Sequence, residues 1–179
     1  MKRTATVALM LNLGVASLYA QQRPVEMTFS GSIVPTSINL KPNTITDEEL
    51  SAGNGTLGNF TFRKLRTDET SPQSFGSCGG GFGPNFRVVA GGGVFRFEDG
   101  SLLTTKIMGG ASCIDVTNGT ATLTVTDQVT GGTGIFKNAT GTLKYTIAAR
   151  VLLVDATMSP VLIAVNGEGS GTIVLSDTL

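Results

Sequence analysis

Apolar and polar residues alternate along most of this chain, which is the pattern of half-buried β-strands. In the first such stretch Val25, Met27 and Phe29 alternate with charged or hydroxyl side chains, and the longest stretch runs over 142–154. Asp99 and Gly100 form a typical hairpin signal between two of these stretches. Strands are predicted at 25–33, 57–65, 85–90, 93–98, 102–108, 121–126, 142–154, 161–165 and 172–175, where 85–90 and 93–98 are either a strand pair or one long strand broken at 91–93. Eight or nine short strands with glycine-rich turns indicate an all-β sandwich or barrel.

Several stretches interrupt the alternation. Residues 39–58 are polar and contain Pro42 and several glycines, so they are predicted to form a long loop. Thr46 and Glu49 have the spacing of a capping box, which leaves room for one helical turn at 46–51. Polar or glycine-rich loops are also predicted at 66–77, 78–84 and 166–171.

The first twenty residues are typical of a secretory signal peptide. Lys2 and Arg3 precede an uncharged run at 4–20, which is followed by polar residues. The alternative is a membrane anchor, but the apolar part is shorter than the roughly 20 residues that a span needs. Cleavage would leave residues 21–179 as one domain, secreted or periplasmic and without a membrane span.

The charge of the expected mature chain argues against one class of partner. The sequence has thirteen basic and thirteen acidic residues, and two of the basic ones lie in the leader, so residues 21–179 carry a net charge of −2. A protein that binds nucleic acid usually has a basic patch. No nucleic-acid partner is therefore expected.

The only two cysteines are Cys78 and Cys113, each in a turn-like setting. Export favours a disulfide between them. The alternatives are two free thiols, a nucleophile or a metal site. Because the chain has no histidine, two sulfurs would make a weak metal site, and no metal or cofactor is expected.

The absence of histidine also excludes Ser-His-Asp and Cys-His catalysis. Acid–base chemistry would fall to carboxylates, lysine or tyrosine. The candidates within predicted strands are Arg87, Arg96, Glu98, Lys106, Lys144, Tyr145 and Arg150. Arg96 and Glu98 share one face of a strand, which either lines a barrel lumen or is a solvated outer face. These two, with Tyr145, are the candidate ligand-binding residues, and no catalytic residue is assigned.

The stretch 131–141 is rich in glycine. Gly131, Gly132, Gly134 and Gly141 allow backbone angles that other residues avoid, and Phe136 is the one large aromatic group between them. We predict a turn, a very short strand and a second turn, with Phe136 buried. A phosphate-binding P-loop is excluded by spacing, because the lysine at 137 follows phenylalanine and not glycine.

This motif, Gly-Gly-Thr-Gly-x-Phe-x-x-Ala-x-Gly, resembles the signature of the allene oxide cyclase and dirigent superfamily. The stretches 93–103 and 113–115 are also similar to uncharacterised secreted bacterial proteins that carry the same motif. The resemblance extends over about 88–141. It implies a single antiparallel β-barrel of about eight strands. No positions outside the motif match catalytic residues of the superfamily.

Two functions are compatible with these features. The first is an exported, non-catalytic barrel that binds a small apolar molecule or has a structural role. The second is a cyclase or dirigent-type enzyme that steers an apolar substrate within the barrel. The first is favoured by the lack of a catalytic constellation, and the second depends on the glycine motif alone.

Overall fold

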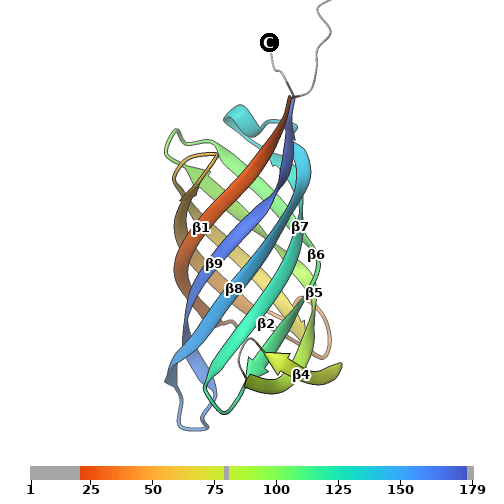
Figure 1. Cartoon of the computed structure of the whole chain (residues 1–179), viewed down its shortest axis with the longest axis vertical. Helices are drawn as coiled ribbons and strands as arrows, with labels where there is room; N and C mark the ends of the chain where they lie inside the picture. Colours follow the sequence, from red (N-terminus) through yellow and green to blue (C-terminus); the bar gives the residue numbers. More distant parts are fainter. Residues whose placement is uncertain (1–20, 79–80, 177–179) are drawn as a thin grey trace, which may run out of the picture.

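The computed structural model describes residues 21–78 and 81–176, and the predicted signal peptide lies outside them. Within these residues the chain forms nine strands and one 3-10 turn (Figure 1). They are β1 (Gln21–Pro35), β2 (Thr44–Gly55), β3 (Phe60–Glu69), β4 (Ser74–Cys78), β5 (Gly81–Phe97), β6 (Leu102–Asp115), β7 (Thr120–Gly132), η1 (Gly134–Phe136), β8 (Thr140–Val154) and β9 (Pro160–Leu175).

Eight of the described strands close into an antiparallel barrel. Their order is β3-β2-β1-β9-β8-β7-β6-β5, and β3 pairs with β5 to complete the ring. β4 stands outside the ring and pairs with the first residues of β5. This confirms the predicted all-β barrel of eight strands. Closure leaves the ring strands no free edge, so every one of them is paired on both sides.

The two ends of the barrel differ. The upper end in Figure 1 carries η1 and the short turns that join β2 to β3 and β5 to β6. The lower end carries β4 and the connections that join β1 to β2, β6 to β7 and β8 to β9. The two ends are named upper and lower in this sense from here on.

The predicted loop at 39–58 is wrong for most of its length. β2 occupies Thr44–Gly55 and pairs with β1 on one side and β3 on the other, and no helical turn forms at 46–51. The polar residues Glu49 and Ser51 are buried and face the lumen. A strand with a polar inward face does not show the apolar alternation on which the prediction relied.

The glycine-rich stretch 166–171 is also strand and not loop, because β9 runs unbroken through it. A Cβ atom on Gly167 would lie 2.3 Å from the Phe29 ring, and one on Gly169 would lie 2.9 Å from the Tyr145 ring. Glycine within a strand often marks such a close approach. These glycines make room for aromatic rings inside the barrel.

Two further loop predictions need correction. β3 continues to Glu69, and residues 74–78 and 81–84 form a hairpin of β4 with the start of β5. In the glycine motif, the expected short strand is the 3-10 turn η1. Phe136 is fully buried, and Gly134 has φ +58°, as expected for a turn that needs glycine.

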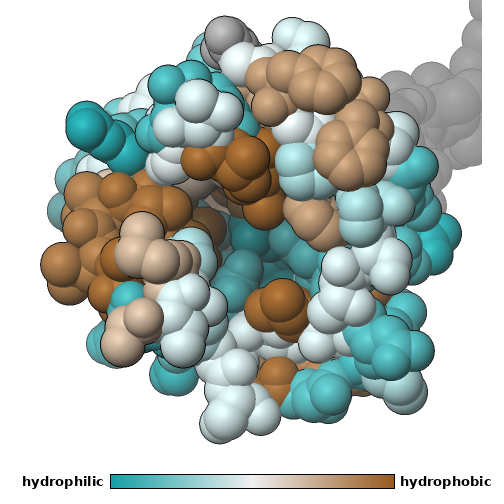
Figure 2. Space-filling view, turned by 90° about the horizontal axis from the view of Figure 1, so that it is seen from below, coloured by the Kyte–Doolittle hydropathy of each residue, from teal (hydrophilic) through white to brown (hydrophobic). Residues whose placement is uncertain are grey.

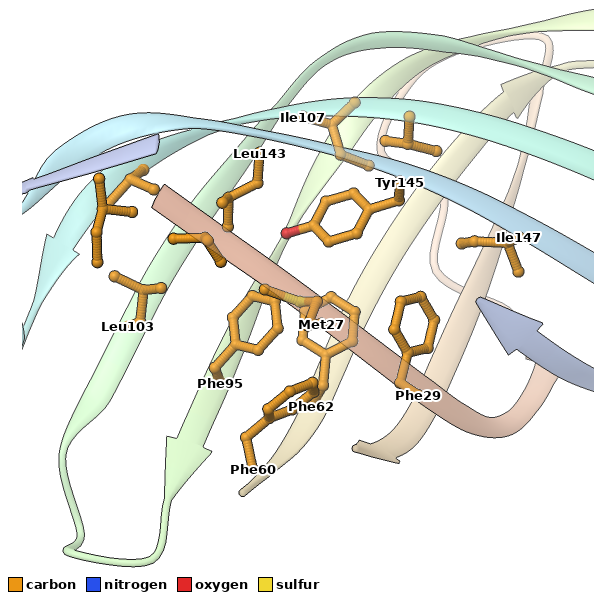
Figure 3. Packing of buried hydrophobic residues seen from close by; sticks show 14 of the residues in the cluster. Met27, Phe29, Phe60, Phe62, Phe95, Leu103, Ile107, Leu143, Tyr145 and Ile147 are labelled. Atoms are coloured by element: carbon orange, nitrogen blue, oxygen red, sulfur yellow. The ribbon is translucent and has the colours of Figure 1, made fainter. Parts of the chain in front are cut away.

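The upper half of the lumen is filled by aromatic and aliphatic side chains (Figure 3). The rings of Phe62 and Phe95 stack with centroids 4.1 Å apart, and Phe136 of η1 lies 4.7 Å from Phe97. Phe29 contacts Tyr145 edge to face at 6.2 Å. This half of the barrel is a packed core.

The predicted disulfide is confirmed. Cys78 at the end of β4 is bonded to Cys113 on β6, and their Cα atoms are 5.2 Å apart. The bond fixes the β4–β5 hairpin to the lower end of the barrel wall. A Cβ on Gly83 would lie 1.8 Å from the Ile114 carbonyl oxygen, so glycine also lets the hairpin lie close to β6.

Candidate functional site

The inward face of β3 changes character along its length. Phe60 and Phe62 lie in the aromatic core, and the next inward positions are Lys64, Arg66 and Asp68. Side chains on one face of a strand recur every second residue, so all five point into the lumen. The lower half of this strand therefore places charges inside the barrel.

Lys64 forms an ion pair that crosses the lumen. Its Nζ donates to both carboxylate oxygens of Asp127 on β7, at 3.0 and 2.9 Å. The Thr105 hydroxyl on β6 donates to Asp127 Oδ2 at 2.8 Å. The ammonium also lies 4.6 Å from the centre of the Tyr145 ring, within the range of a cation–π interaction. The pair separates the aromatic core above from the lower mouth of the barrel.

A second charged group lies below this pair. Arg66 Nη2 donates to Asp47 Oδ2 of β2 at 2.9 Å. Its Nε is 3.2 Å from Asp68 Oδ1, close enough for an ion pair, although both atoms lack a well-directed hydrogen bond. Asp68 Oδ2 accepts a hydrogen bond from the Ser112 hydroxyl at 2.8 Å. We call Asp47, Glu49, Lys64, Arg66, Asp68 and Asp127 the lumen charge cluster.

Exposure to solvent increases down the cluster. The side chains of Asp127 and Lys64 are 0 and 2% exposed, Arg66 is 8% exposed, and Asp68 and Asp47 are 15 and 16% exposed. Solvent therefore reaches the cluster from the lower end. Figure 2, which looks into this end, shows a hollow with hydrophilic residues at its base.

The wall that faces the charges is apolar. Ile33 of β1, Ile147 and Ala149 of β8 and Val165 of β9 are buried with their side chains inward. β1, β8 and β9 are neighbours in the barrel, whereas β2 and β3 carry most of the cluster. The hollow therefore has a charged side and an apolar side.

Apolar side chains also surround the lower mouth. Most of the large hydrophobic residues that are exposed in the described part of the chain lie at this end. They come from the β4–β5 hairpin, the β6–β7 turn, the β8–β9 hairpin, the segment that leads into β2 and the start of β2 itself. We call this set the apolar collar: Ile38, Leu40, Ile45, Phe75, Phe82, Val116, Leu152, Leu153, Val154, Met158 and Val161. Figure 2 shows these hydrophobic groups around the hollow.

Burial changes the acid–base behaviour of the cluster. It raises the pKa of Glu49, which Lys64 opposes, and it raises the pKa of Asp47, which Arg66 opposes. Burial lowers the pKa of Lys64, and the Asp127 carboxylate acts against this by stabilising the ammonium. Glu49 accepts a hydrogen bond from the Ser51 hydroxyl at 2.9 Å.

Tyr145 lies beside the Lys64–Asp127 pair. Its hydroxyl is buried and makes no hydrogen bond within the described residues. Burial and the negative charges of Asp127 and Glu49 raise its pKa well above 10.0. The group therefore stays protonated at neutral pH, and it can still give or accept a hydrogen bond.

Of the predicted ligand-binding residues, only Tyr145 faces the lumen. Arg96 and Glu98 are exposed on the outer face, where Glu98 accepts a hydrogen bond from Asn59 at 2.8 Å, so of the two positions considered for them the structure has the solvated outer face. The other strand candidates are also exposed on the outside: Arg87, which pairs with Glu69, Lys106, Lys144 and Arg150.

The sequence interpretation missed the residues of the charge cluster, although parity could have found most of them. Lys64 shares the parity of Phe60 and Phe62, and Asp127 shares the parity of Leu123 and Val125. A charged residue on the apolar face of a predicted strand marks a buried charge, which needs a partner. Asp47 and Glu49 gave no such signal, because their strand was not recognised.

Comparisons with known proteins add little to the site. No protein-family model matches this sequence, and no curated protein does. A solved structure of a pterocarpan synthase dirigent protein aligns over 90% of both chains, with a TM-score of 0.45 and 14% sequence identity. In the described residues no helix is long and apolar enough to cross a membrane, and no three metal-binding side chains gather.

The strand pairing itself therefore defines the class of protein. It is a closed, eight-stranded antiparallel barrel with an aromatic core at one end and a charge cluster at the other. Such a small barrel has an interior that side chains fill or that holds one small ligand. This one does the first in its upper half and opens to solvent in a hollow at its lower mouth (Figure 2).

Proposed function

We propose that this chain is an exported barrel that binds one small amphipathic molecule at its lower mouth and does not transform it. The observation that carries the proposal is the solvent-facing hollow with the lumen charge cluster on one side and an apolar wall on the other. Ligand sites in proteins are typically concave and mostly apolar, with a few convergent polar groups.

The charge cluster supports binding more than a structural role. Buried ion pairs contribute little net stability, and apolar residues of similar volume often replace them without loss. A barrel that only had to be stable could continue the aromatic core to its lower end. The disulfide also supports export, since such bonds persist in oxidising compartments.

Binding can be tested with the neutral fluorescent probe N-phenyl-1-naphthylamine and with dodecanol as a competitor. The inward Ala149 lies in the apolar wall, so Ala149→Phe should fill the hollow and weaken probe binding by about tenfold or more, a loss of about 1.4 kcal/mol. Ala148→Phe is the matched control, because the adjacent side chain points outward and is exposed.

Equal binding by the two variants would reject the proposed site. Circular dichroism and a thermal melt establish that each variant is folded. If Ala149→Phe does not fold, Ile163→Phe at the inward rim of β9 replaces it.

A cyclase or dirigent-type enzyme is the second candidate. It is favoured by the buried Tyr145 hydroxyl, which has no partner within the described residues. This hydroxyl points toward Leu143 and the aromatic core (Figure 3), so a substrate would receive its hydrogen bond only by entering the upper lumen. The test is turnover of phenolic and fatty-acid-derived substrates, compared with Tyr145→Phe. Turnover above the protein-free rate that is lost in Tyr145→Phe would establish catalysis and overturn the non-catalytic proposal.

A further inference from the structure

We infer that the lower mouth selects amphiphiles with a cationic head, such as a primary amine, over those with a carboxylate. The inference rests on the proposed function and names the ligand class of the same site. In this arrangement the head reaches the lumen charge cluster, and the alkyl or aryl body lies against the apolar wall and the apolar collar.

Negative charge is in excess inside the barrel. The lumen charge cluster holds four carboxyl groups against one lysine and one arginine. Asp127 is satisfied by Lys64 and Thr105 and is sealed from solvent. Below it, Arg66 contacts two carboxyl groups, those of Asp47 and Asp68, and the Glu49 carboxyl lies opposite Lys64.

The part of the site that a ligand meets first is therefore acidic. Asp47 and Asp68 are the most exposed side chains of the cluster, and they flank Arg66 from two sides. A carboxylate ligand would add a fifth negative group where the one reachable cation is already shared. An ammonium group would instead offset the excess, and charges interact more strongly at low dielectric than in water.

A buried acceptor without a well-directed hydrogen bond lies in this lower part of the cluster. Asp68 Oδ1 accepts no such bond within the described residues, although Arg66 Nε is 3.2 Å away. An unsatisfied buried acceptor is costly. An ammonium group that enters the hollow can donate to this oxygen. The Tyr145 hydroxyl takes no part in this contact, because it points toward Leu143 and the aromatic core (Figure 3).

The apolar collar accounts for the rest of the ligand. Phe75 and Phe82 project from neighbouring positions of the β4–β5 hairpin, where Phe82 pairs with Ser77 and Phe75 pairs with Pro84. Both are about two-thirds exposed, at 64 and 67%. With Met158 and Leu153 of the opposite hairpin they provide an apolar surface beyond the mouth. A ligand bound head-first would leave its body on this surface.

The experiment compares three ligands of one chain length below their aggregation concentrations: dodecylamine, dodecanoic acid and dodecanol. Each competes with N-phenyl-1-naphthylamine at pH 7.5, and isothermal titration gives direct affinities. We expect dodecylamine to bind about tenfold or more tightly than dodecanoic acid, with dodecanol between them. The preference should weaken as salt is raised.

Two variants locate the preference. Asp47→Asn and Asp68→Asn keep the size of the side chains and remove negative charge, so each should reduce the advantage of the amine several-fold and leave dodecanol binding unchanged. Glu168→Gln on the exposed outer face of β9 is the control and should change nothing. The stability of each variant is measured by thermal melting without ligand.

The outcomes separate this inference from the proposed function. Equal affinity for the three ligands, or tighter binding of the acid, overturns the cationic preference and leaves binding at the mouth intact. If none of the three ligands binds and Ala149→Phe leaves the affinity for the probe unchanged, the proposed function itself fails. An amine preference that persists in both asparagine variants would place the cation elsewhere and overturn the inference.

Discussion

Lys64 and Asp127 stabilise the lumen only as a pair. Both side chains are removed from water, and each loses hydration that the other and Thr105 replace. Removing one partner leaves an uncompensated charge in a region of low dielectric, which is far more costly than removing both. At this scale the two residues form one contact between β3 and β7 that needs both of its charges.

We predict that Lys64→Met lowers the free energy of unfolding by about 3–5 kcal/mol, because it leaves the buried Asp127 carboxylate without a counter-ion. The double variant Lys64→Met/Asp127→Leu should recover most of this loss. Urea denaturation of the four proteins of the cycle measures the coupling. Lys144→Met on the exposed outer face is the control and should change stability by about 0.5 kcal/mol or less. A double variant no more stable than Lys64→Met would contradict the pairing argument.

The contribution of Glu49 to stability is predicted to depend on pH. Burial raises the pKa of Glu49 above 4.5 in the folded state, and the nearby negative charge of Asp127 adds a smaller increase. The charges of Lys64 and Arg66 and the hydrogen bond from Ser51 oppose this rise. The folded protein thus binds this proton more tightly than the unfolded chain. The contribution of Glu49 to stability is therefore full below pH 4.5 and is lost as the pH rises through the raised value.

Glu49→Gln should accordingly melt at a higher temperature than the wild type at pH 7, and the difference should shrink as the pH falls toward 4.5. The glutamine amide oxygen can still accept the hydrogen bond from the Ser51 hydroxyl, so the two proteins differ in the charge at this position and not in this hydrogen bond. Melting curves from pH 4 to 8 measure the effect, with Glu168→Gln as the exposed control. A constant difference across this range would show that ionisation of Glu49 is not the cause.

At the scale of elements, the glycine motif closes the upper end of the barrel. η1 places Phe136 against Phe97 of β5, and Gly141 lets β8 approach β9, where a Cβ would lie 2.2 Å from the Thr172 carbonyl oxygen. The motif thus joins β7 to β8 and seals the aromatic core with one ring. Its glycines serve the backbone geometry and not a phosphate.

We predict that Phe136→Ala lowers the stability by about 3–5 kcal/mol, as for other buried phenylalanines. Gly134→Val should also destabilise, because Gly134 has φ +58° and a Cβ there would lie 2.2 Å from Ser101 Oγ. Ile135→Ala, in the same turn but exposed, is the control. A ligand-free melt of Phe136→Ala that superimposes on the wild type would refute this structural role.

The disulfide acts on the other end of the barrel. It closes a segment of 36 residues from Cys78 to Cys113, for which the chain-entropy relation gives about 3–4 kcal/mol. We predict a loss of this size in Cys78→Ser/Cys113→Ser, measured by urea denaturation. Reductant should bring the wild type to the same midpoint and leave the variant unchanged. Reductant-insensitive wild-type stability would contradict a stabilising bond.

At the scale of the whole molecule, the barrel is polarised along its axis. The upper half is a dry core, and the lower half combines buried charge with the exposed apolar collar. Exposed apolar patches on a soluble protein usually mark an interaction site. Because of this difference between the two halves, we propose the binding site at the lower mouth and not on the outer wall.

Export is a prediction at this scale. Intact-mass analysis of the protein from the secreted or periplasmic fraction should find an N-terminus near Gln21, the first residue of β1. Cleavage there would leave every described strand complete. A chain that still begins at Met1 in that fraction would contradict the signal peptide.

The sequence by itself determined the all-β class, and its resemblance to the dirigent superfamily implied the barrel. The alternation over 25–33, 121–126 and 142–154 reports burial on one face, which each strand shows locally. The same logic failed at 44–55 and 166–171. There the inward residues are polar or glycine, and their role depends on partners from other strands, such as Lys64 opposite Glu49 and Phe29 beside Gly167.

The pairing of charges within the cluster was decided by tertiary structure alone. Lys64 and Asp127 are 63 residues apart, and they meet only because β3 closes on β5 in a register that puts Lys64 opposite Gly93. A shift of one residue in the register of β3 would turn Lys64 outward and leave Asp127 buried without a counter-ion. The alternation along a strand shows that a side chain faces inward, whereas the side chain that it meets there depends on how the whole barrel closes.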